Sequence, residues 1–494
     1  MLVWTLILFP ALAGLAALFI RHNALRRGLL VVTATVHLAL TVTCWTRQGN
    51  LVLNDWLAID SASLLFLTTT SVLFMAAALY TVGFLGREAG HGKQATDFEE
   101  GFLFDNQREA TFTGCMLLFL ATMTLVTASS HLGLVWVAME ATTLTSAPLI
   151  YYHRHHRSLE ATWKYLLICS VGIALALMGN YCLAVAGSFG GGEPVHLTVK
   201  ALTEHAAELD PVWLKTAFIM VLVGYGTKMG LAPLHTWLPD AHSEAPSMIS
   251  ALLSGALLNC AFLAILRMFS VLAAAGLGPF ASDLMVLFGL LSMAVAAVFL
   301  IAQVDFKRLL AYSSVEHMGI LSLGVGLGGL AGFGAMLHAL NHSLTKAALF
   351  LTAGNVLSLY KTKRIDQVTG LLKVSPLTAC LWLAGLLAIT GSPPFGLFVS
   401  ELTILRGALA GGHWTVAVLY LALLAVVFIA LARTALTTTF GVAPLGLARP
   451  QARESVLSVL PPALLILGTL TLGLIVPEGL QGVLQGAARQ LGVP

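Results

Sequence analysis

The sequence predicts an all-α, polytopic membrane protein, and three observations support this fold class. Of the 494 residues, 58% are hydrophobic and only 10% are charged, whereas a soluble domain carries about 25% charged residues. The apolar residues form runs long enough for helices to cross a bilayer, which takes about 20 residues each. The net charge of +3 is small and dispersed, so nothing indicates nucleic-acid binding. Together these features exclude a water-soluble enzyme.

Fourteen apolar runs of spanning length follow one another along the chain. The first could be mistaken for a signal peptide, but its first positive charge, Arg21, follows the apolar run, so we expect a retained span. Only the segments 86–110, 188–213 and 438–455 are long and hydrophilic. The predicted spans are residues 2–20, 28–46, 62–85, 111–129, 131–151, 164–187, 214–231, 247–268, 283–303, 309–329, 331–358, 376–403, 414–437 and 456–476.

Basic residues predict the orientation of these spans, because cytoplasmic loops are enriched in Lys and Arg. The loops after odd-numbered spans hold 18 basic residues, and the even-numbered loops with the C-terminal segment hold 6. We therefore expect odd-numbered loops in the cytoplasm and both termini on the outer or periplasmic side. The odd loops hold Arg21, Arg26, Arg27, Arg87, Lys93, Arg108, Arg154, Arg157, Lys164, Lys307, Arg308, Lys361, Lys363, Arg364, Lys373, Arg433, Arg449 and Arg453; the others are Arg47, Lys200, Lys215, Arg267, Arg406 and Arg489.

An internal repeat is indicated by two similar segments. Residues 230–240 read GLAPLHTWLPD and residues 391–401 read GSPPFGLFVSE, so that Gly230 aligns with Gly391 without gaps. These segments interrupt spans seven and twelve with Gly and Pro. Because the spans are five apart, their orientations are opposite, as in transporters built from inverted repeats around broken helices. The alternative is a chance likeness of two Pro-containing helices.

Ionisable side chains inside a span are costly, about 2.5–3.5 kcal/mol each on insertion scales, so they need a partner or a function. On a helix, His338, His342 and Lys346 form one polar stripe, because a spacing of four residues turns about 40° and rises about 6 Å per step. Such a stripe suits a proton relay, since histidine titrates near neutral pH. Helix-to-helix pairing alone is the alternative. The candidate proton-transfer residues are Glu140, Lys228, Glu316, His317, His338, His342, Lys346 and Glu401.

No motif for a cofactor or a metal emerges from the sequence. The six cysteines lie in or beside apolar runs without a CxxC pair, so we expect no iron–sulfur cluster and no disulfide framework. Gly324, Gly326 and Gly329 match GxGxxG, but no strand precedes them, and we interpret them as packing glycines. The run HRHHR at 153–157 is interpreted as a solvated, lipid-facing positive patch, with metal binding as the alternative.

Four longer runs resemble the proton-translocating, antiporter-like subunits shared by respiratory complex I, Mrp-type cation/proton antiporters and group 4 nickel–iron hydrogenases. They are GTKMGLAPLHTWLPDAHSEAPSMISALLSGALL (226–258), DFKRLLAYSSVEHMGIL (305–321), HALNHSLTKAALFLTAGNV (338–356) and GSPPFGLFVSE (391–401). The likeness extends over most of the chain. Within the family, the first two runs look most like the F component of hydrogenase-4.

The resemblance implies a fold of 14 transmembrane helices with two inverted five-helix halves, spans 4–8 and 9–13, in which helices 7 and 12 are broken. It divides the chain into N-terminal helices with a cytoplasmic loop (1–110), a first half (111–268), a second half (281–437) and a C-terminal loop with the last helix (438–494). We expect no long lateral helix of the kind found in the largest complex I subunit.

The resemblance also implies roles for the candidate residues. Glu140 matches the glutamate that partners the broken-helix lysine, here Lys228. Lys346 and its histidines match the central polar axis, and Glu401 matches the terminal charged residue of the second half. Many complex I relatives carry a Lys or His in span eight, where this chain offers only Asn259. The link between the halves is therefore expected to run through water, Asn259 or His317.

The hypothesis that follows is a proton-translocating membrane subunit of a hydrogenase-4-type complex in a bacterial or archaeal cell membrane. The subunit is expected to hold no cofactor or redox centre of its own, and other membrane and hydrophilic subunits are expected to transfer the electrons. One alternative is an Mrp-type subunit that exchanges Na⁺ or K⁺ for H⁺. Another is a scaffold that only anchors a redox arm.

Overall fold

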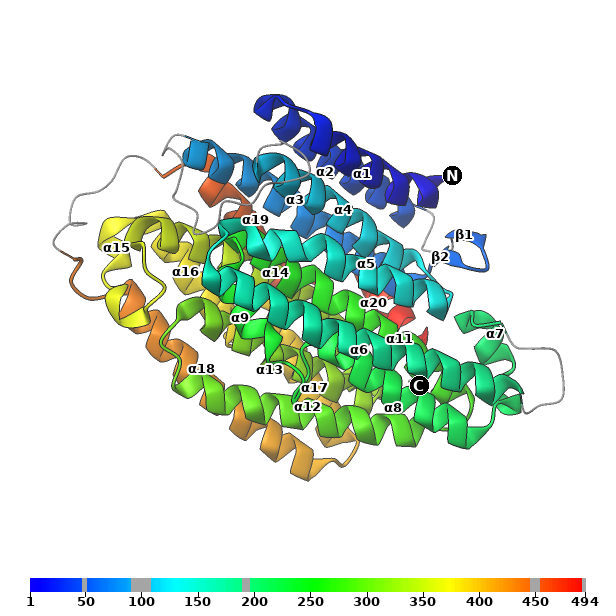
Figure 1. Cartoon of the computed structure of the whole chain (residues 1–494). Helices are drawn as coiled ribbons and strands as arrows, with labels where there is room; N and C mark the ends of the chain where they lie inside the picture. Colours follow the sequence, from blue (N-terminus) through cyan, green and yellow to red (C-terminus); the bar gives the residue numbers. More distant parts are fainter. Residues whose placement is uncertain (47–50, 90–107, 189–195, 445–453, 491–494) are drawn as a thin grey trace.

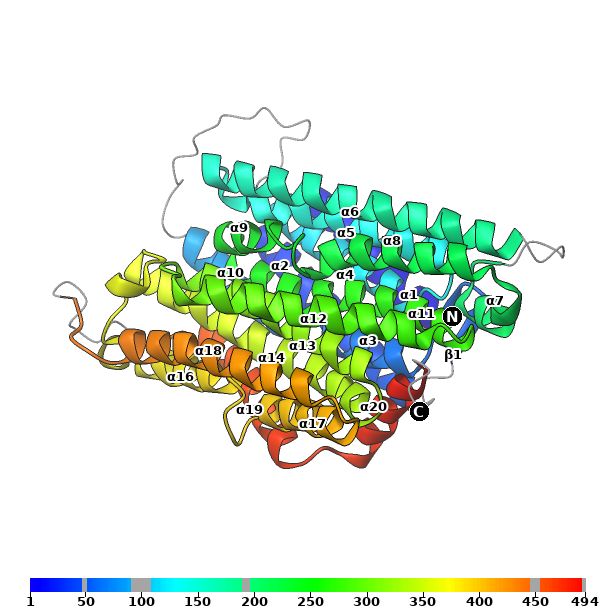
Figure 2. The same cartoon turned by 90° about the horizontal axis from the view of Figure 1, so that it is seen from below.

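The computed structural model describes residues 1–46, 51–89, 108–188, 196–444 and 454–490. Most of the predicted hydrophilic loops at 86–110 and 438–455 therefore lies outside the described residues. The helices run roughly parallel to one another along the long direction of the molecule (Figure 1). A short hairpin, α7 and α20 lie toward one end, and α15 lies toward the other (Figures 1 and 2).

The first part of the chain contains long helices and the hairpin. In the hairpin, Leu51 pairs with Ile59 in antiparallel register, and Asn54 Oδ1 accepts hydrogen bonds from the backbone N–H groups of Trp56 and Leu57, which close the turn. The elements are α1 (Leu2–Phe19), α2 (Asn23–Trp45), β1 (Leu51–Asn54), β2 (Leu57–Ile59), α3 (Ser61–Ala89), α4 (Arg108–Ala128), α5 (Leu132–Ile150), η1 (Tyr151–His153), α6 (His156–Ser188), α7 (Val199–Glu204) and η2 (Ala206–Glu208).

The rest of the chain contains shorter helices as well as long ones. Aspartates begin two of them: the Asp210 and Asp305 side chains accept hydrogen bonds from the first backbone N–H groups of α8 and α13. The elements are α8 (Pro211–Met229), α9 (Trp237–Glu244), α10 (Ser247–Leu252), the π-helical η3 (Leu253–Leu257), α11 (Leu258–Ala274), α12 (Gly278–Ile301), α13 (Phe306–Leu327), α14 (Gly329–Tyr360), η4 (Ile365–Gln367), α15 (Leu371–Val374), α16 (Pro376–Ile389), α17 (Gly396–Ala410), α18 (Trp414–Thr439), α19 (Val456–Leu474) and α20 (Glu478–Gln490).

The two predicted helix breaks have the same form. Helix α8 ends at Gly230, whose φ is +84°, and α9 begins at Trp237. Helix α16 is followed by Gly391, whose φ is +63°, and α17 begins at Gly396. A positive φ costs glycine little because it has no Cβ, which explains why glycines end these helices. The inverted repeat itself stays a prediction.

The helices divide into an inner and an outer group. The most apolar stretch of Ser247–Ala274 is entirely buried, and most of α13 and α14 is buried as well. Helices α1, α2, α6, α12, α18 and α19 expose large apolar side chains, among them Leu12, Val171, Val298, Ile429 and Leu464. An apolar surface of this extent requires lipid or another protein to cover it. The arrangement is that of a multi-pass membrane protein.

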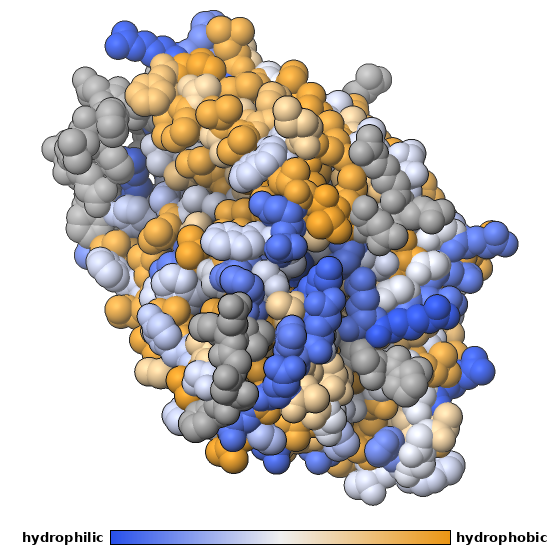
Figure 3. All heavy atoms as spheres, turned by 90° about the vertical axis from the view of Figure 1, so that its right-hand side faces the viewer, coloured by the Kyte–Doolittle hydropathy of each residue, from blue (hydrophilic) through white to orange (hydrophobic). Residues whose placement is uncertain are grey.

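The end of the molecule that carries the hairpin and α7 is partly polar (Figure 3). Figure 3 views the end that carries the hairpin and α7, and hydrophilic residues gather across the middle of this end while hydrophobic residues dominate its upper part. Polar end faces and an apolar girdle are expected where helices cross a bilayer from end to end. Helix α20, which the sequence analysis did not predict, also lies toward this end (Figure 2).

Among the described residues, ten helices are long and apolar enough to cross a membrane. The predicted count of fourteen is therefore not confirmed. Predicted spans seven, ten, eleven and twelve fall on α8, α13, α14 and the α16–α17 pair, none of which is among the ten. These four spans contain Lys228, Glu316, Lys346 and Glu401. Buried ionisable side chains lower the mean hydropathy of a helix, and a break divides a span into shorter helices such as α16 and α17. The helices that carry the candidate site are therefore harder to recognise as membrane spans.

Candidate functional site

Lys228 lies in the last turn of α8, directly before the break at Gly230. The residue is fully buried, and its Nζ donates hydrogen bonds to Thr143 Oγ1 at 2.7 Å and to Tyr165 OH at 2.8 Å. The Tyr165 hydroxyl is also 2.6 Å from Ser146 Oγ. Two hydroxyl groups, one from α5 and one from α6, therefore accept hydrogen bonds from the ammonium group, and Ser146 of α5 in turn contacts the tyrosine hydroxyl.

Glu140 and Lys228 are joined through Thr143. Glu140 Oε2 accepts a long hydrogen bond of 3.4 Å from Thr143 Oγ1, and Glu140 Oε1 accepts one of 3.0 Å from Ser170 Oγ. No salt bridge between Glu140 and Lys228 is found among the described residues. The predicted pair is thus a carboxylate–hydroxyl–ammonium series. Thr143 and Tyr165 belong to it, although as uncharged residues they do not stand out in the sequence.

Lys346 lies at the centre of α14 and is fully buried. Its Nζ donates hydrogen bonds to the Leu310 carbonyl oxygen at 2.7 Å and to Ser313 Oγ, both on α13. Glu316, one turn along α13, is 1% exposed, and its Oε2 has no hydrogen-bond partner in the described part of the chain. The lysine therefore binds α13 through a carbonyl and a hydroxyl group.

The predicted histidines form a continuous group between α13 and α14. His317 Nδ1 lies 3.0 Å from His338 Nε2, and His338 Nδ1 lies 3.0 Å from Ser400 Oγ on α17. The His317 and His342 rings are 5.1 Å apart between centroids. His317, from α13, therefore lies beside both α14 histidines.

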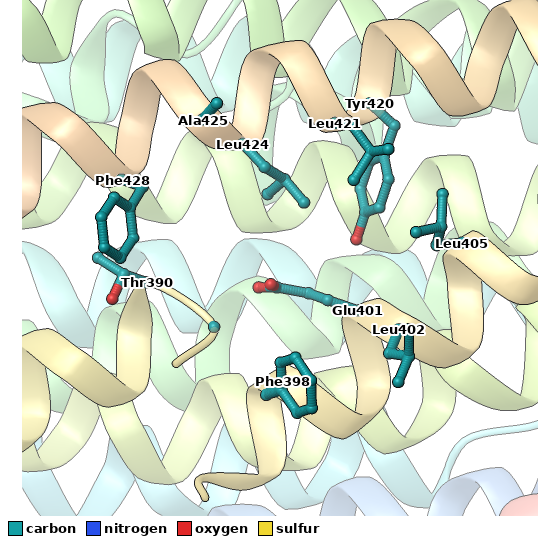
Figure 4. Close-up of a pocket in the computed structure, with 11 residues that line it drawn as sticks. Thr390, Phe398, Glu401, Leu402, Leu405, Tyr420, Leu421, Leu424, Ala425 and Phe428 are labelled. Carbon is teal, nitrogen blue, oxygen red and sulfur yellow. The ribbon is translucent and has the colours of Figure 1, made fainter. Parts of the chain in front are cut away.

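Glu401 lies at one end of this histidine group. One ligand atom from each of His317, His338 and Glu401 falls within 4.8 Å of the others. The Glu401 carboxyl projects into a cavity of about 280 Å³ between α17 and α18, which Thr390, Gly391 and Tyr420 also line (Figure 4). Glu401 is 7% exposed. Glu401 therefore lies between the histidine group and this cavity.

The π-helical segment and α11 make polar contacts with α13 and α14. Asn259 Nδ2 donates a hydrogen bond of 2.7 Å to Ser343 Oγ of α14, and another of 3.0 Å to the Gly255 carbonyl oxygen. The hydroxyl groups of Ser254 and Ser314 are 2.8 Å apart. Asn259 therefore contacts the central helix directly.

Several further buried polar groups were not selected from the sequence. His242 is fully buried and stacks on Phe350 at 4.8 Å between centroids, and neither ring nitrogen has a hydrogen-bond partner among the described residues. Arg26, Arg267 and Lys307 are buried too, although counting charges placed them in loops. They donate hydrogen bonds to backbone carbonyl groups. His242 lies within the motif at 226–258. Its position could have been found from the sequence, because a histidine next to an apolar run indicates a functional residue.

The HRHHR run joins an ionic cluster at one end of the bundle. His155 Nε2 is 3.6 Å from Glu244 Oε2, and Lys363 Nζ is 3.0 Å from Glu244 Oε1. His155, His156, Arg157, Glu244 and Lys363 line a cavity of about 400 Å³. Burial raises the pKa of Glu244, but the charge and hydrogen bond of Lys363 outweigh it and hold the pKa below 4.5, its ordinary value. The run at 153–157 thus lines a cavity and takes part in an ion-pair cluster. Its contact with lipid stays a prediction.

Solved structures of three membrane complexes contain a chain with the same fold. The chain aligns with a chain of the membrane-bound sulfane sulfur reductase, an archaeal respiratory membrane complex, with a TM-score of 0.85, 21% identity and coverage of 99% of this chain and 97% of that one. For the Mrp complex of Dietzia sp. DQ12-45-1b, the TM-score is 0.83 at 21% identity, with 99% and 98% covered. For respiratory complex I of Thermus thermophilus with bound NADH, it is 0.81 at 23%, with 99% and 100% covered. The chain therefore has the fold of a chain found in each of these three membrane complexes.

Sequence comparison identifies the family. Residues 129–428 match the model of the transmembrane family described as NADH:quinone oxidoreductase/Mrp antiporter, and the chain belongs to it. It is 38% identical over 354 residues to a hydrogenase-4 component F homolog of Methylacidiphilum infernorum, covering 71% of this chain and 72% of that protein. It is also 28% identical to hydrogenase-4 component B of Escherichia coli, with 81% and 60% covered. All eight candidate residues lie inside the matched region.

Proposed function

We propose that the protein is the proton-translocating membrane subunit of a hydrogenase-4-type respiratory complex. The observation that carries the proposal is two polar series inside the helix bundle. One joins the half-buried Glu140 to the buried Lys228, and the other contains the buried Lys346, His317, His338, His342 and Glu401. Membrane helices rarely hold such groups without a transport role, because each charge is costly to bury. The 38% identity to a hydrogenase-4 component F homolog favours this type of complex.

The proposed mechanism uses two proton-transfer segments joined by α10, η3 and α11. In the first, loss of a proton from Lys228 is coupled to the state of Glu140 through Thr143. In the second, the proton passes between Lys346, the histidines and Glu401. Partner subunits carry out the electron transfer and shift the Glu140–Lys228 series, so that redox work changes where the proton is held. Odd-numbered loops face the cytoplasm in this proposal, and both termini face the opposite side.

The test is proton translocation by the intact complex in inverted vesicles. Replacing Lys228 or Glu140 by Ala is expected to abolish proton translocation while the complex still assembles and oxidises its electron donor, because each change removes one end of the first series. Lys215→Ala, on the same helix but near its first turn, and Glu160→Ala, an exposed residue on α6, are matched controls that should keep translocation. Normal pumping by both Lys228→Ala and Glu140→Ala would contradict the proposal.

The alternative, an Mrp-type exchanger of Na⁺ or K⁺ for H⁺, is favoured by the description of the matched family, which includes Mrp antiporters. Sodium dependence of transport in vesicles distinguishes the two, together with the subunits that copurify. A nickel–iron hydrogenase large subunit in the purified complex supports the first proposal, and transport that needs Na⁺ but no electron donor supports the second.

A further inference from the structure

The Glu401 carboxyl group has no neutralising partner in the part of the chain that the structure describes. It is 7% exposed and lies at the floor of the cavity between α17 and α18, and no hydrogen bond or ion pair to it is found among the described residues. Gly391 approaches it so closely that an added Cβ would overlap Oε2. A buried carboxyl group in this state needs either a proton or a bound cation.

The neighbours of Glu401 determine which cation fits. One nitrogen each from His317 and His338 lies within 4.8 Å of a Glu401 oxygen and of each other. Imidazole nitrogens with one carboxylate oxygen are ligands for Zn²⁺ and related transition-metal ions, whereas Na⁺, Mg²⁺ and Ca²⁺ prefer oxygen ligands alone. The donor set therefore selects a borderline-soft divalent ion.

The surroundings of His338 match those of a metal-binding histidine. Its Nε2 faces His317 while its Nδ1 is 3.0 Å from Ser400 Oγ. A ligating histidine usually donates its second N–H to such an acceptor, which fixes the ring and leaves the other nitrogen free to bind the metal. The cavity of about 280 Å³ has room for water, which takes about 30 Å³ per molecule and can supply the fourth ligand that three-residue zinc sites leave open.

We propose that His317, His338 and Glu401 form a binding site for a Zn²⁺-type ion, and that an ion bound there blocks the second proton-transfer segment. The bound ion takes one nitrogen of each histidine out of proton exchange between His317 and His338, and it binds the Glu401 carboxylate that would receive the proton. The binding half of the proposal stands on the geometry of the three side chains. The blocking half rests on the proposed function.

The binding test uses the intact complex, washed with EDTA and titrated with ZnCl₂ by calorimetry. Co²⁺ serves as a second probe because its visible spectrum reports tetrahedral coordination. His338→Gln and Glu401→Gln are each expected to weaken Zn²⁺ binding at least about tenfold and to remove the tetrahedral Co²⁺ spectrum. His342→Gln is the matched control, since His342 is buried on the same helix one turn away but outside the ligand set, and it should retain binding.

Two outcomes overturn the binding proposal. One is the absence of Zn²⁺ binding by the wild-type complex. The other is binding that survives His338→Gln and Glu401→Gln but is lost when His155 and His156 are replaced by Gln, which would place the ion in the ionic cluster at the bundle end. Inhibition of wild-type pumping by Zn²⁺ tests the blocking half. If the complex pumps no protons at all, the proposed function fails while the titration still decides whether the site exists.

Discussion

At the scale of single residues, the site depends on hydroxyl groups as much as on charges. The Thr143 hydroxyl lies between Glu140 and Lys228, and the Tyr165 hydroxyl accepts a second hydrogen bond from Lys228. The Ser400 hydroxyl is hydrogen-bonded to His338. Charges could be predicted from sequence because they are rare in apolar runs. Serine and threonine are common in membrane helices and usually bond to their own backbone, so nothing in the sequence separates Thr143 from Thr142.

Replacing Thr143 by Val should therefore uncouple Glu140 from Lys228. The change keeps the shape but removes a hydrogen bond to a charged group, worth about 1.5–3 kcal/mol, so we expect proton translocation to fall by about tenfold or more without loss of the folded protein. Thr143→Ser should restore much of the rate. The measurement is the initial rate of proton uptake into vesicles per electron donor oxidised.

Thr142→Val is the control for this change. Thr142 is buried on the same helix, but its hydroxyl bonds only to the Met139 carbonyl oxygen, at 2.6 Å, within the described part of the chain. Equal rates for Thr142→Val and Thr143→Val would show that Thr143 contributes packing alone.

At the scale of elements, the sequence predicted the long apolar helices and the places where two of them break. Gly230 and Gly391 marked these breaks, since few other residues tolerate their φ angles. The hairpin at 51–59 and the amphipathic α20 were missed, because β1 and β2 are too short to show a period and α20 is not apolar enough to resemble a span. The packing of His317 against two histidines of α14 depends on which faces of α13 and α14 meet, and no periodicity in a uniformly buried helix shows this.

Gly391→Ala tests the importance of the second break. The left-handed φ of +63° should cost alanine about 1–2 kcal/mol of stability, and the new Cβ would overlap Glu401 Oε2 and displace the carboxyl group. We expect a lower unfolding temperature in detergent and loss of proton translocation.

Gly412→Ala separates these two effects. Gly412 has a φ of +75°, but no atom of the described residues lies within 4 Å of the Cβ position. This variant should lose similar stability and keep translocation. If it stops transport as well, backbone strain and not the position of Glu401 explains the Gly391→Ala result.

At the scale of the whole molecule, an ionic cluster holds the two predicted halves together at one end. Glu244, at the end of α9, pairs with Lys363 from the segment after α14, and Asp240 pairs with both Lys164 of α6 and Arg308 of α13. In the sequence, these basic residues predict only the orientation of the spans. Their pairing could not be predicted, because it joins residues more than 60 positions apart.

Glu244→Gln should lower the stability of the folded protein by about 1–3 kcal/mol at neutral pH, because it leaves Lys363 without a charged partner. The pKa of Glu244 in the folded protein lies below its ordinary value of 4.5, so its contribution is present above that pH and is lost as the pH falls through the folded-state pKa. Acidification from neutral pH to below 4.5 should therefore destabilise the wild type more than Glu244→Gln.

The measurement is the unfolding temperature across this pH range. Glu204→Gln is the control, because Glu204 is exposed and its partner Lys200 is 4.0 Å away, so the change should have little effect at any pH. Parallel pH profiles for the wild type and Glu244→Gln would contradict the assigned role.

The π-helical turn at Leu253–Leu257 determines in which direction around the helix axis the side chains of α11 point. A π-helical turn contains one residue more than an α-helical turn. The side chains that follow it are therefore rotated about the helix axis by about 100° relative to a continuous α-helix. Asn259, two positions beyond this turn, meets Ser343 of α14 in that shifted phase. A helical wheel drawn continuously through residues 247–274 therefore assigns the wrong neighbours to one half of the helix. For any chain of this fold with such a turn, the residue that faces the centre must be counted from the turn and not from the start of the helix.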